Sequence, residues 1–163
     1  MDLALYVLGW GALLSAALSA LIVVSLRVEP RIWLHDAPRA IQDAVPPKSE
    51  REKRLTWMFA VPVFALALGI PVIAVAMRPV PLGYLEALAI TYGVLSVFNV
   101  VDLVLIDWLL VCTWTPRWLV VPGTEHLLHV YRDHGFHLRE CGKGCIGLFV
   151  LSLPLAALGL WLS

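Results

Sequence analysis

The sequence predicts an all-α membrane protein with four transmembrane helices, and three observations lead to this fold class. Hydrophobic residues make up 60% of the 163 positions and charged residues only 15%, whereas soluble domains are about half apolar and a quarter charged. Four segments are long and apolar enough to cross a hydrocarbon core, which requires about 20 helical residues. The basic residues lie almost entirely in the two connections that follow the first and third of these segments.

The expected spans lie within a single transmembrane domain, 1–163, and cover residues 3–26, 55–77, 82–112 and 145–162. The first span contains no charged residue and lacks the basic start of a cleaved signal peptide, so we expect it to be a true span. The second and fourth contain prolines, which membrane helices tolerate as kinks. The third is longer than the hydrocarbon core requires, so part of it must tilt or protrude.

The distribution of basic residues predicts the orientation of these spans, because lysine and arginine near span ends are retained in the cytoplasm. The predicted loops 27–54 and 113–144 contain all of the 12 lysines and arginines except Arg78. We therefore expect both termini outside and both loops in the cytoplasm. This layout is that of a multi-pass protein of a bacterial-type inner membrane.

One sector of the third span is polar. At about 100° per residue, this sector contains Tyr92, Ser96, Asn99 and Asp102, with Asp107 at its margin. Ionisable groups at membrane depth usually face the bundle interior and mark a site. A helical rise of about 1.5 Å per residue brings this end of the span to the cytoplasmic boundary. The alternative is that both aspartates are interfacial and pair with arginines of the loops.

The second predicted loop contains four of the five histidines, in the stretch PGTEHLLHVYRDHGFHLRECGKGC, residues 122–145. Thr124 as an N-cap and Gly135 as a terminator predict a short helix over about 125–134. Imidazole and carboxylate groups are ligands of zinc, iron and manganese, and the stretch has two His-x-x-His pairs. A divalent metal is therefore the expected cofactor. Its predicted ligands are His126, His129, His134, His137 and Asp102.

Within this region we expect Asp102, His129 and His134 to carry acid–base catalysis. The predicted substrate-binding residues are Asn99, Asp107, Arg132, Arg139 and Lys143, in which the cations would hold an anionic group. His35 and Asp36 of the first loop could reach the same region. Because the spacing matches no strict metal motif, histidines that are solvated or bind lipid headgroups remain the alternative.

These patterns predict an enzyme whose site opens at the cytoplasmic interface and acts on a lipid or another amphiphile. The alternative is a non-catalytic subunit or assembly factor of a membrane complex. A small transporter is a weaker alternative, because only one span carries buried charge and no internal repeat is visible.

Membrane lipids are the expected partners, and helices rich in glycine and alanine could also associate into a homo-oligomer or a larger membrane complex. The sequence has no basic run typical of nucleic-acid binding, so nucleic acid is not an expected partner. The three cysteines show no Cys-x-x-Cys spacing, which argues against a disulfide framework.

Overall fold

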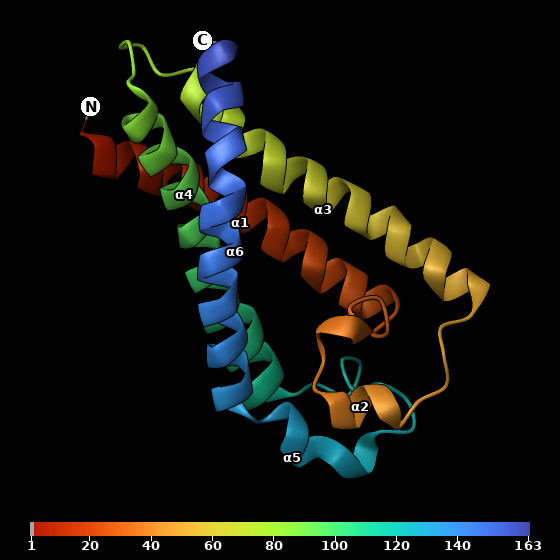
Figure 1. Cartoon of the computed structure of the whole chain (residues 1–163). Coiled ribbons are helices and arrows are strands. Elements are labelled where there is room, and N and C mark those ends of the chain that lie inside the picture. The colour runs from red at the N-terminus through yellow and green to blue at the C-terminus, as the bar shows by residue number, and fades with distance from the viewer. Residues whose placement is uncertain (1) are drawn as a thin grey trace.

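The computed structural model describes residues 2–163, which form four long helices and several short ones (Figure 1). The long helices are α1 (Leu3–Val28), α3 (Glu50–Ala76), α4 (Tyr84–Val101) with its continuation η2 (Asp102–Trp114), and α6 (His134–Trp161). Each of the four is long and apolar enough to cross a membrane. The predicted all-α class and the four candidate spans are thereby confirmed, whereas the orientation in the membrane stays a prediction.

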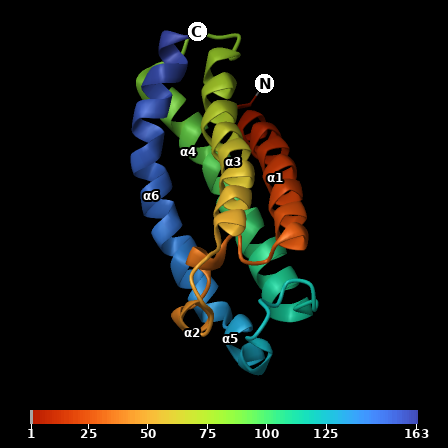
Figure 2. The same cartoon turned by 90° about the vertical axis from the view of Figure 1, so that its right-hand side faces the viewer.

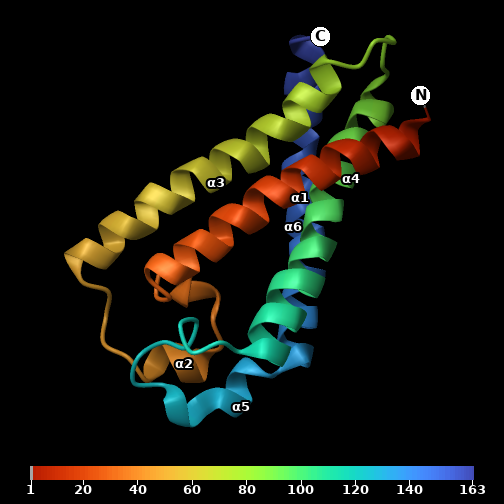
Figure 3. The ribbon, with the colours of Figure 1, turned by 180° about the vertical axis from the view of Figure 1, so that it is seen from behind.

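The two ends of the bundle differ. The start of α1 and the end of α6 lie at one end, and the two long loops lie at the other (Figures 1 and 2). The loops carry the short helices η1 (Leu34–Asp36), α2 (Arg39–Asp43), η3 (Glu125–Leu127) and α5 (Leu128–Tyr131). Seen in Figure 3, α1 and α3 run side by side and slope away from η2 and the first half of α6. The long helices therefore pack closely near the chain ends and diverge toward the loops.

The closely packed end contains a hydrophobic core to which all four long helices contribute. Leu14 of α1, Val75 of α3 and Ile90 of α4 are fully buried there, and Leu155 of α6 is nearly so. These side chains lie in the halves of the helices that are farther from the loops. The core thus fixes the bundle at one end and leaves the other end free to diverge.

Two glycines allow α1 and α4 to approach each other closely. A Cβ atom on Gly11 would lie 2.6 Å from Cβ of Val97, and one on Gly93 would lie 2.6 Å from Cγ1 of Val7. Both distances are shorter than a van der Waals contact, so only a residue without a side chain fits without displacing its neighbour. Small residues at helix crossings are typical of membrane helix packing.

A second, smaller core joins the loops to η2. Ile41 of α2 is fully buried and packs in this cluster with Ile106 and Leu110 of η2. The second loop contributes Leu119 and Tyr131. Because both loops bury apolar side chains against the same helix, they pack together and cover the end of the bundle at which the long helices diverge.

The structure moves the start of the last helix relative to the sequence prediction. A short helix over 125–134, followed by a span from 145, was expected. Instead α6 begins at His134, because the Oδ1 atom of Asp133 accepts a hydrogen bond from the backbone N–H of Phe136 at 2.9 Å and caps the helix. Gly135 therefore lies in the first turn of α6 and does not end the short helix that was expected before it. The helix α3 likewise begins before the expected position, at Glu50, behind the capping Ser49.

Candidate functional site

A cavity lies between the two cores, where the long helices diverge. It has a volume of about 410 Å³, is partly open, and is lined by residues of α1, α3, α4, η2, α6 and both loops. Cavities of roughly 300–1,000 Å³ hold small-molecule ligands in proteins. The size and position of this cavity make it the candidate functional site.

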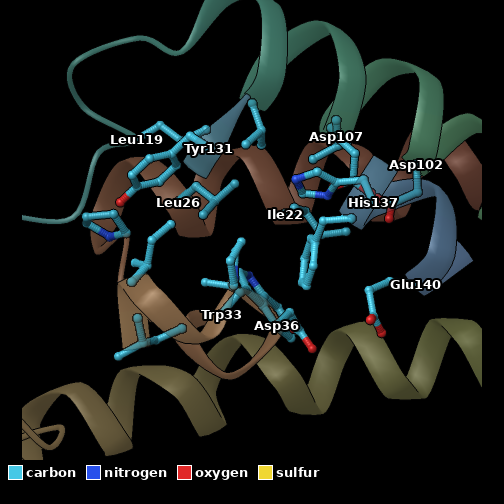
Figure 4. A pocket seen from close by; sticks show the side chains of 18 of the residues that line it. Ile22, Leu26, Trp33, Asp36, Asp102, Asp107, Leu119, Tyr131, His137 and Glu140 are labelled. Carbon is cyan, nitrogen blue, oxygen red and sulfur yellow. The ribbon is translucent and has the colours of Figure 1, made fainter. Parts of the chain in front are cut away.

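Most of the cavity wall is apolar. The helix α1 contributes Ile22 and Leu26, α3 contributes Phe64, and the second loop contributes Leu119 and Tyr131. In Figure 4, Leu26, Leu119 and Tyr131 lie together on one side of the cavity. Burying apolar surface is favourable by about 25 cal/mol per Å², so this wall suits an alkyl chain.

The opposite side of the cavity is acidic (Figure 4). It carries Asp36, Asp102, Asp107, His137 and Glu140, which come from η1, η2 and α6. No lysine or arginine lines the cavity within residues 2–163. The cavity therefore has an apolar part and a polar part, as a site for an amphiphile would.

The helical form of η2 explains why Asp102 and Asp107 line the same cavity. In an α-helix, side chains five residues apart point about 140° away from each other. However, η2 is a π-helix, in which each backbone N–H bonds to the carbonyl five residues earlier. The N–H of Thr115 still makes such a bond, at 2.9 Å, directly after η2. Residues five apart therefore lie on the same side of the helix, and the pair Ile106 and Val111 faces the cavity for the same reason.

His137 and Asp107 form the most specific contact of the site. The Nδ1 atom of His137 lies 3.0 Å from Oδ1 of Asp107, and their side chains are only 11% and 24% exposed. The carboxylate accepts a hydrogen bond from Nδ1–H, which leaves the lone pair of a neutral imidazole on Nε2. This Nε2 atom is buried and has no hydrogen-bond partner among residues 2–163. The arrangement leaves a buried acceptor on a residue that lines the cavity.

Asn99 fastens α4 to α6 beside the cavity. Its Nδ2 atom donates a hydrogen bond to the carbonyl of Cys141 at 3.2 Å and lies 3.2 and 3.3 Å from the Sγ atoms of Cys141 and Cys145. A Cβ atom on Gly144 would lie 2.9 Å from the Asn99 Oδ1 atom, so this glycine permits the close crossing. Although Asn99 lines the cavity, its amide is engaged in holding the two helices together.

The second loop is folded around the hydroxyl group of Tyr131. The backbone N–H of Val121 donates to this oxygen at 3.0 Å. The Oγ1 atom of Thr124 donates to the carbonyl of Val121, so the Tyr131 hydroxyl donates to Thr124 Oγ1 at 2.7 Å. All three residues are buried. This network holds the aromatic ring of Tyr131 against the cavity.

The first loop is attached to the beginning of α3. Arg31 forms an ion pair with Glu52 at 2.8 Å, and both side chains are largely buried. The Nζ atom of Lys48 donates to the carbonyl of Ile32 at 2.6 Å and to Thr56 Oγ1 at 3.1 Å. Burial lowers the pKa of Lys48, with Arg31 lowering it further and Glu52 opposing the shift. These contacts hold the loop segment that closes the cavity.

Asp36 belongs to this loop segment and extends the acidic side of the cavity. Its carboxylate lies 3.2 Å from Nε2 of His35, and both side chains are about two-thirds exposed. Although much of its side chain contacts water, the partial burial of Asp36 in the cavity wall raises the pKa of its carboxyl group, His35 opposes the rise, and Asp107 and Glu140 add to it. Asp36, Asp107 and Glu140 come from three different elements and line the same cavity.

The histidines that the sequence analysis grouped into a metal site are not brought together. His126, His129 and His134 are exposed and do not line the cavity. His134 packs its ring against that of Trp108 of η2, at 5.9 Å between centroids, and only His137 contacts a carboxylate of η2, which is Asp107 rather than Asp102. Within residues 2–163, no group of three or more His, Cys, Asp or Glu side chains is placed to hold a metal ion. The metal therefore stays a prediction of the sequence alone.

The cations that were expected to bind substrate also lie outside the cavity. Arg132 is exposed, Arg139 lies 3.9 Å from Asp133, and Lys143 lies 2.6 Å from Glu140. None of the three lines the cavity. Because α6 begins earlier than expected, Arg139 and Lys143 occupy its outward faces instead of a loose loop, and Arg132 lies just before the helix. The site is thus acidic where cationic groups were expected.

The structure adds Asp36, Glu140 and Cys141 to the site, none of which was predicted as a site residue. Glu140 and Cys141 stand three and four residues after His137, which is the spacing of one α-helical face. If a continuous helix from Asp133 onward had been predicted, this shared face would have been visible in the sequence. Asp36 was expected only to be able to reach this region, and the packing of the first loop is what brings it to the cavity.

The comparisons with known proteins leave the geometry as the basis for assigning a function. No protein-family model matches the sequence, no curated protein matches it, and no solved structure matches it. The functional argument therefore rests on the cavity and on the side chains that line it.

Proposed function

We propose that this chain is an integral membrane enzyme that binds an amphiphile in the cavity and uses His137 as a general base, with Asp107 as its positioning residue. The observation that carries the proposal is the 3.0 Å contact between His137 Nδ1 and Asp107 Oδ1, beside a buried Nε2 atom without a partner. A carboxylate that fixes the tautomer and orientation of a histidine is a recurring feature of acid–base sites.

The cavity supports an amphiphile as the ligand. Its apolar wall includes Ile22 and Leu26 of α1 and Phe64 of α3, whereas its polar side is formed mainly by η2 and α6. A lipid-like molecule can therefore place its chain among the helices and its headgroup beside His137. In this position Nε2 can accept a proton from a headgroup N–H or O–H, and Asp107 stabilises the imidazolium that forms.

Ligand binding is tested by filling the cavity. Ala37 and Val63 line it from the first loop and from α3, so Ala37→Trp and Val63→Phe should each reduce the amount of amphiphile that copurifies in mild detergent. The matched controls Ala40→Trp and Val61→Phe add the same side chains at exposed positions outside the cavity. Native mass spectrometry measures the bound amphiphile. Equal retention by all four variants and the unaltered protein would remove the cavity as the binding site.

Catalysis is tested by incubating the purified protein with a membrane lipid extract and comparing the lipid species before and after by mass spectrometry. We expect the unaltered protein and Ala40→Trp to consume at least one species that His137→Gln leaves unchanged. Retention of amphiphile without any consumption would reject the enzyme and leave a binding protein.

A further inference from the structure

The charges around the cavity point to the chemical class of the headgroup. Four carboxylates line the polar side, and two of them have a basic neighbour: Asp36 lies beside His35, and Glu140 beside Lys143. Asp107 accepts a hydrogen bond from His137. A neutral histidine leaves the charge of Asp107 uncompensated, so this side of the cavity carries net negative charge.

Asp102 is the carboxylate with the fewest partners. It is half-buried in the cavity wall and forms no hydrogen bond or ion pair through its side chain with any other part of the described chain. A carboxylate removed from water without a partner is costly, and a cation that binds beside it offsets this cost. Asp102 and Asp107 lie on one face of η2, so a single ligand can meet both.

The buried Nε2 atom of His137 adds a requirement for a hydrogen-bond donor. In the neutral imidazole, the proton on Nδ1 is held by Asp107, so Nε2 accepts a hydrogen bond. A headgroup that satisfies both the carboxylates and this nitrogen must carry a positive charge and an N–H group. A protonated amine has both properties, a quaternary ammonium lacks the N–H, and an alcohol lacks the charge.

We infer that the cavity selects an amphiphile with a protonated amine headgroup, which Asp102 and Asp107 bind by charge and His137 Nε2 binds as an acceptor. This inference rests on the proposed function, because it names the ligand of the same cavity. It also specifies the proton that the general base removes. Transfer of one proton from the ammonium group to Nε2 yields a neutral amine and an imidazolium.

The test is a competition for the purified protein among four amphiphiles that share a dodecyl chain: dodecylamine, dodecyltrimethylammonium, dodecanol and dodecyl sulfate. Bound species are counted by native mass spectrometry from a nonionic detergent at pH 7. Because a hydrogen bond to a charged group corresponds to about tenfold or more in affinity, the amine should exceed the alcohol by at least about tenfold. The quaternary ammonium should fall between them, and the sulfate should bind least.

Variants locate the preference. Asp102→Asn removes a charge with little change in shape and should reduce the ratio of bound amine to bound alcohol by about tenfold. The control Asp43→Asn makes the same change at an exposed position outside the cavity and should leave the ratio unchanged. Size-exclusion chromatography and thermal unfolding establish that both variants are folded. If Asp102→Asn fails to fold, Glu140→Gln serves as the second variant at the same side of the cavity.

The outcomes separate the two proposals. If Ala37→Trp and Val63→Phe reduce the binding of none of the dodecyl compounds, the proposed function fails. If binding is reduced by these cavity-filling variants but the alcohol or the sulfate equals the amine, only the inference of an ammonium headgroup fails. Equal binding of the amine and the quaternary ammonium would contradict the role of His137 Nε2 as an acceptor.

Discussion

The contact between Asp107 and His137 makes a quantitative prediction about stability. The perturbation is a double-mutant cycle that consists of Asp107→Ala, His137→Ala and the double variant. The side chains meet at 3.0 Å and are only 24% and 11% exposed, so solvent screens this hydrogen bond less than a surface contact. Hydrogen bonds to charged groups contribute about 1.5–3 kcal/mol. We therefore expect a coupling free energy of about 1.5–3 kcal/mol between the two positions.

The assay is denaturant-induced unfolding in detergent micelles, from which the free energy of unfolding of each variant is obtained. The control is the same cycle for Glu50 and Lys53, which form an ion pair at 2.8 Å but are 84% and 55% exposed. Exposed pairs of this kind contribute less than about 1 kcal/mol. The reasoning would be refuted if the coupling between Asp107 and His137 did not exceed that between Glu50 and Lys53.

Three further predictions concern the parts of the fold that surround the site. Gly11→Ala should lower the free energy of unfolding by about 1–3 kcal/mol relative to Gly9→Ala, because only at Gly11 does a new Cβ lie 2.6 Å from α4; equal stability would contradict the close crossing. Tyr131→Phe should cost about 1–3 kcal/mol in the same assay, since a buried N–H loses its acceptor, and an unchanged value would argue against the network. Because the pKa of Asp36 is raised in the folded protein, its contribution to the free energy of unfolding is fully present below the ordinary pKa of the group. This contribution is lost as pH rises through the raised pKa. Asp36→Asn should therefore have a flatter profile of unfolding free energy against pH and should not be less stable at neutral pH.

The helices were predictable from the sequence because hydropathy and length are local properties. A run of apolar residues must be helical in a bilayer, where each backbone polar group needs a partner within the segment. The polar sector of the third span was also visible as a periodicity, and it correctly brought Asn99, Asp102 and Asp107 to one region. The start of α6 was predicted wrongly, because a glycine such as Gly135 favours a helix end, whereas here the side chain of Asp133 caps a new helix.

The parts of the site that sequence reasoning missed depend on tertiary structure. A π-helix has no simple sequence signature, yet it places Asp107 on the same face as Asp102 instead of at the margin. Asp36 comes to the cavity only because Ile41 anchors the first loop in the second core. Arg139 and Lys143 do not take their expected place in the site, because a helix that exposes one face to the cavity turns its other faces outward.

The central claim is that the cavity between the two cores holds an amine-bearing amphiphile. The most direct measurement is photocrosslinking with a long-chain alkylamine that carries a diazirine in its chain, followed by peptide mass spectrometry. We predict labelling of cavity-lining residues from separate elements, such as Trp33, Phe64 and Ile106, and loss of this labelling in Ala37→Trp. Labelling confined to outward-facing residues such as Ile146, which is 70% exposed, would contradict the claim.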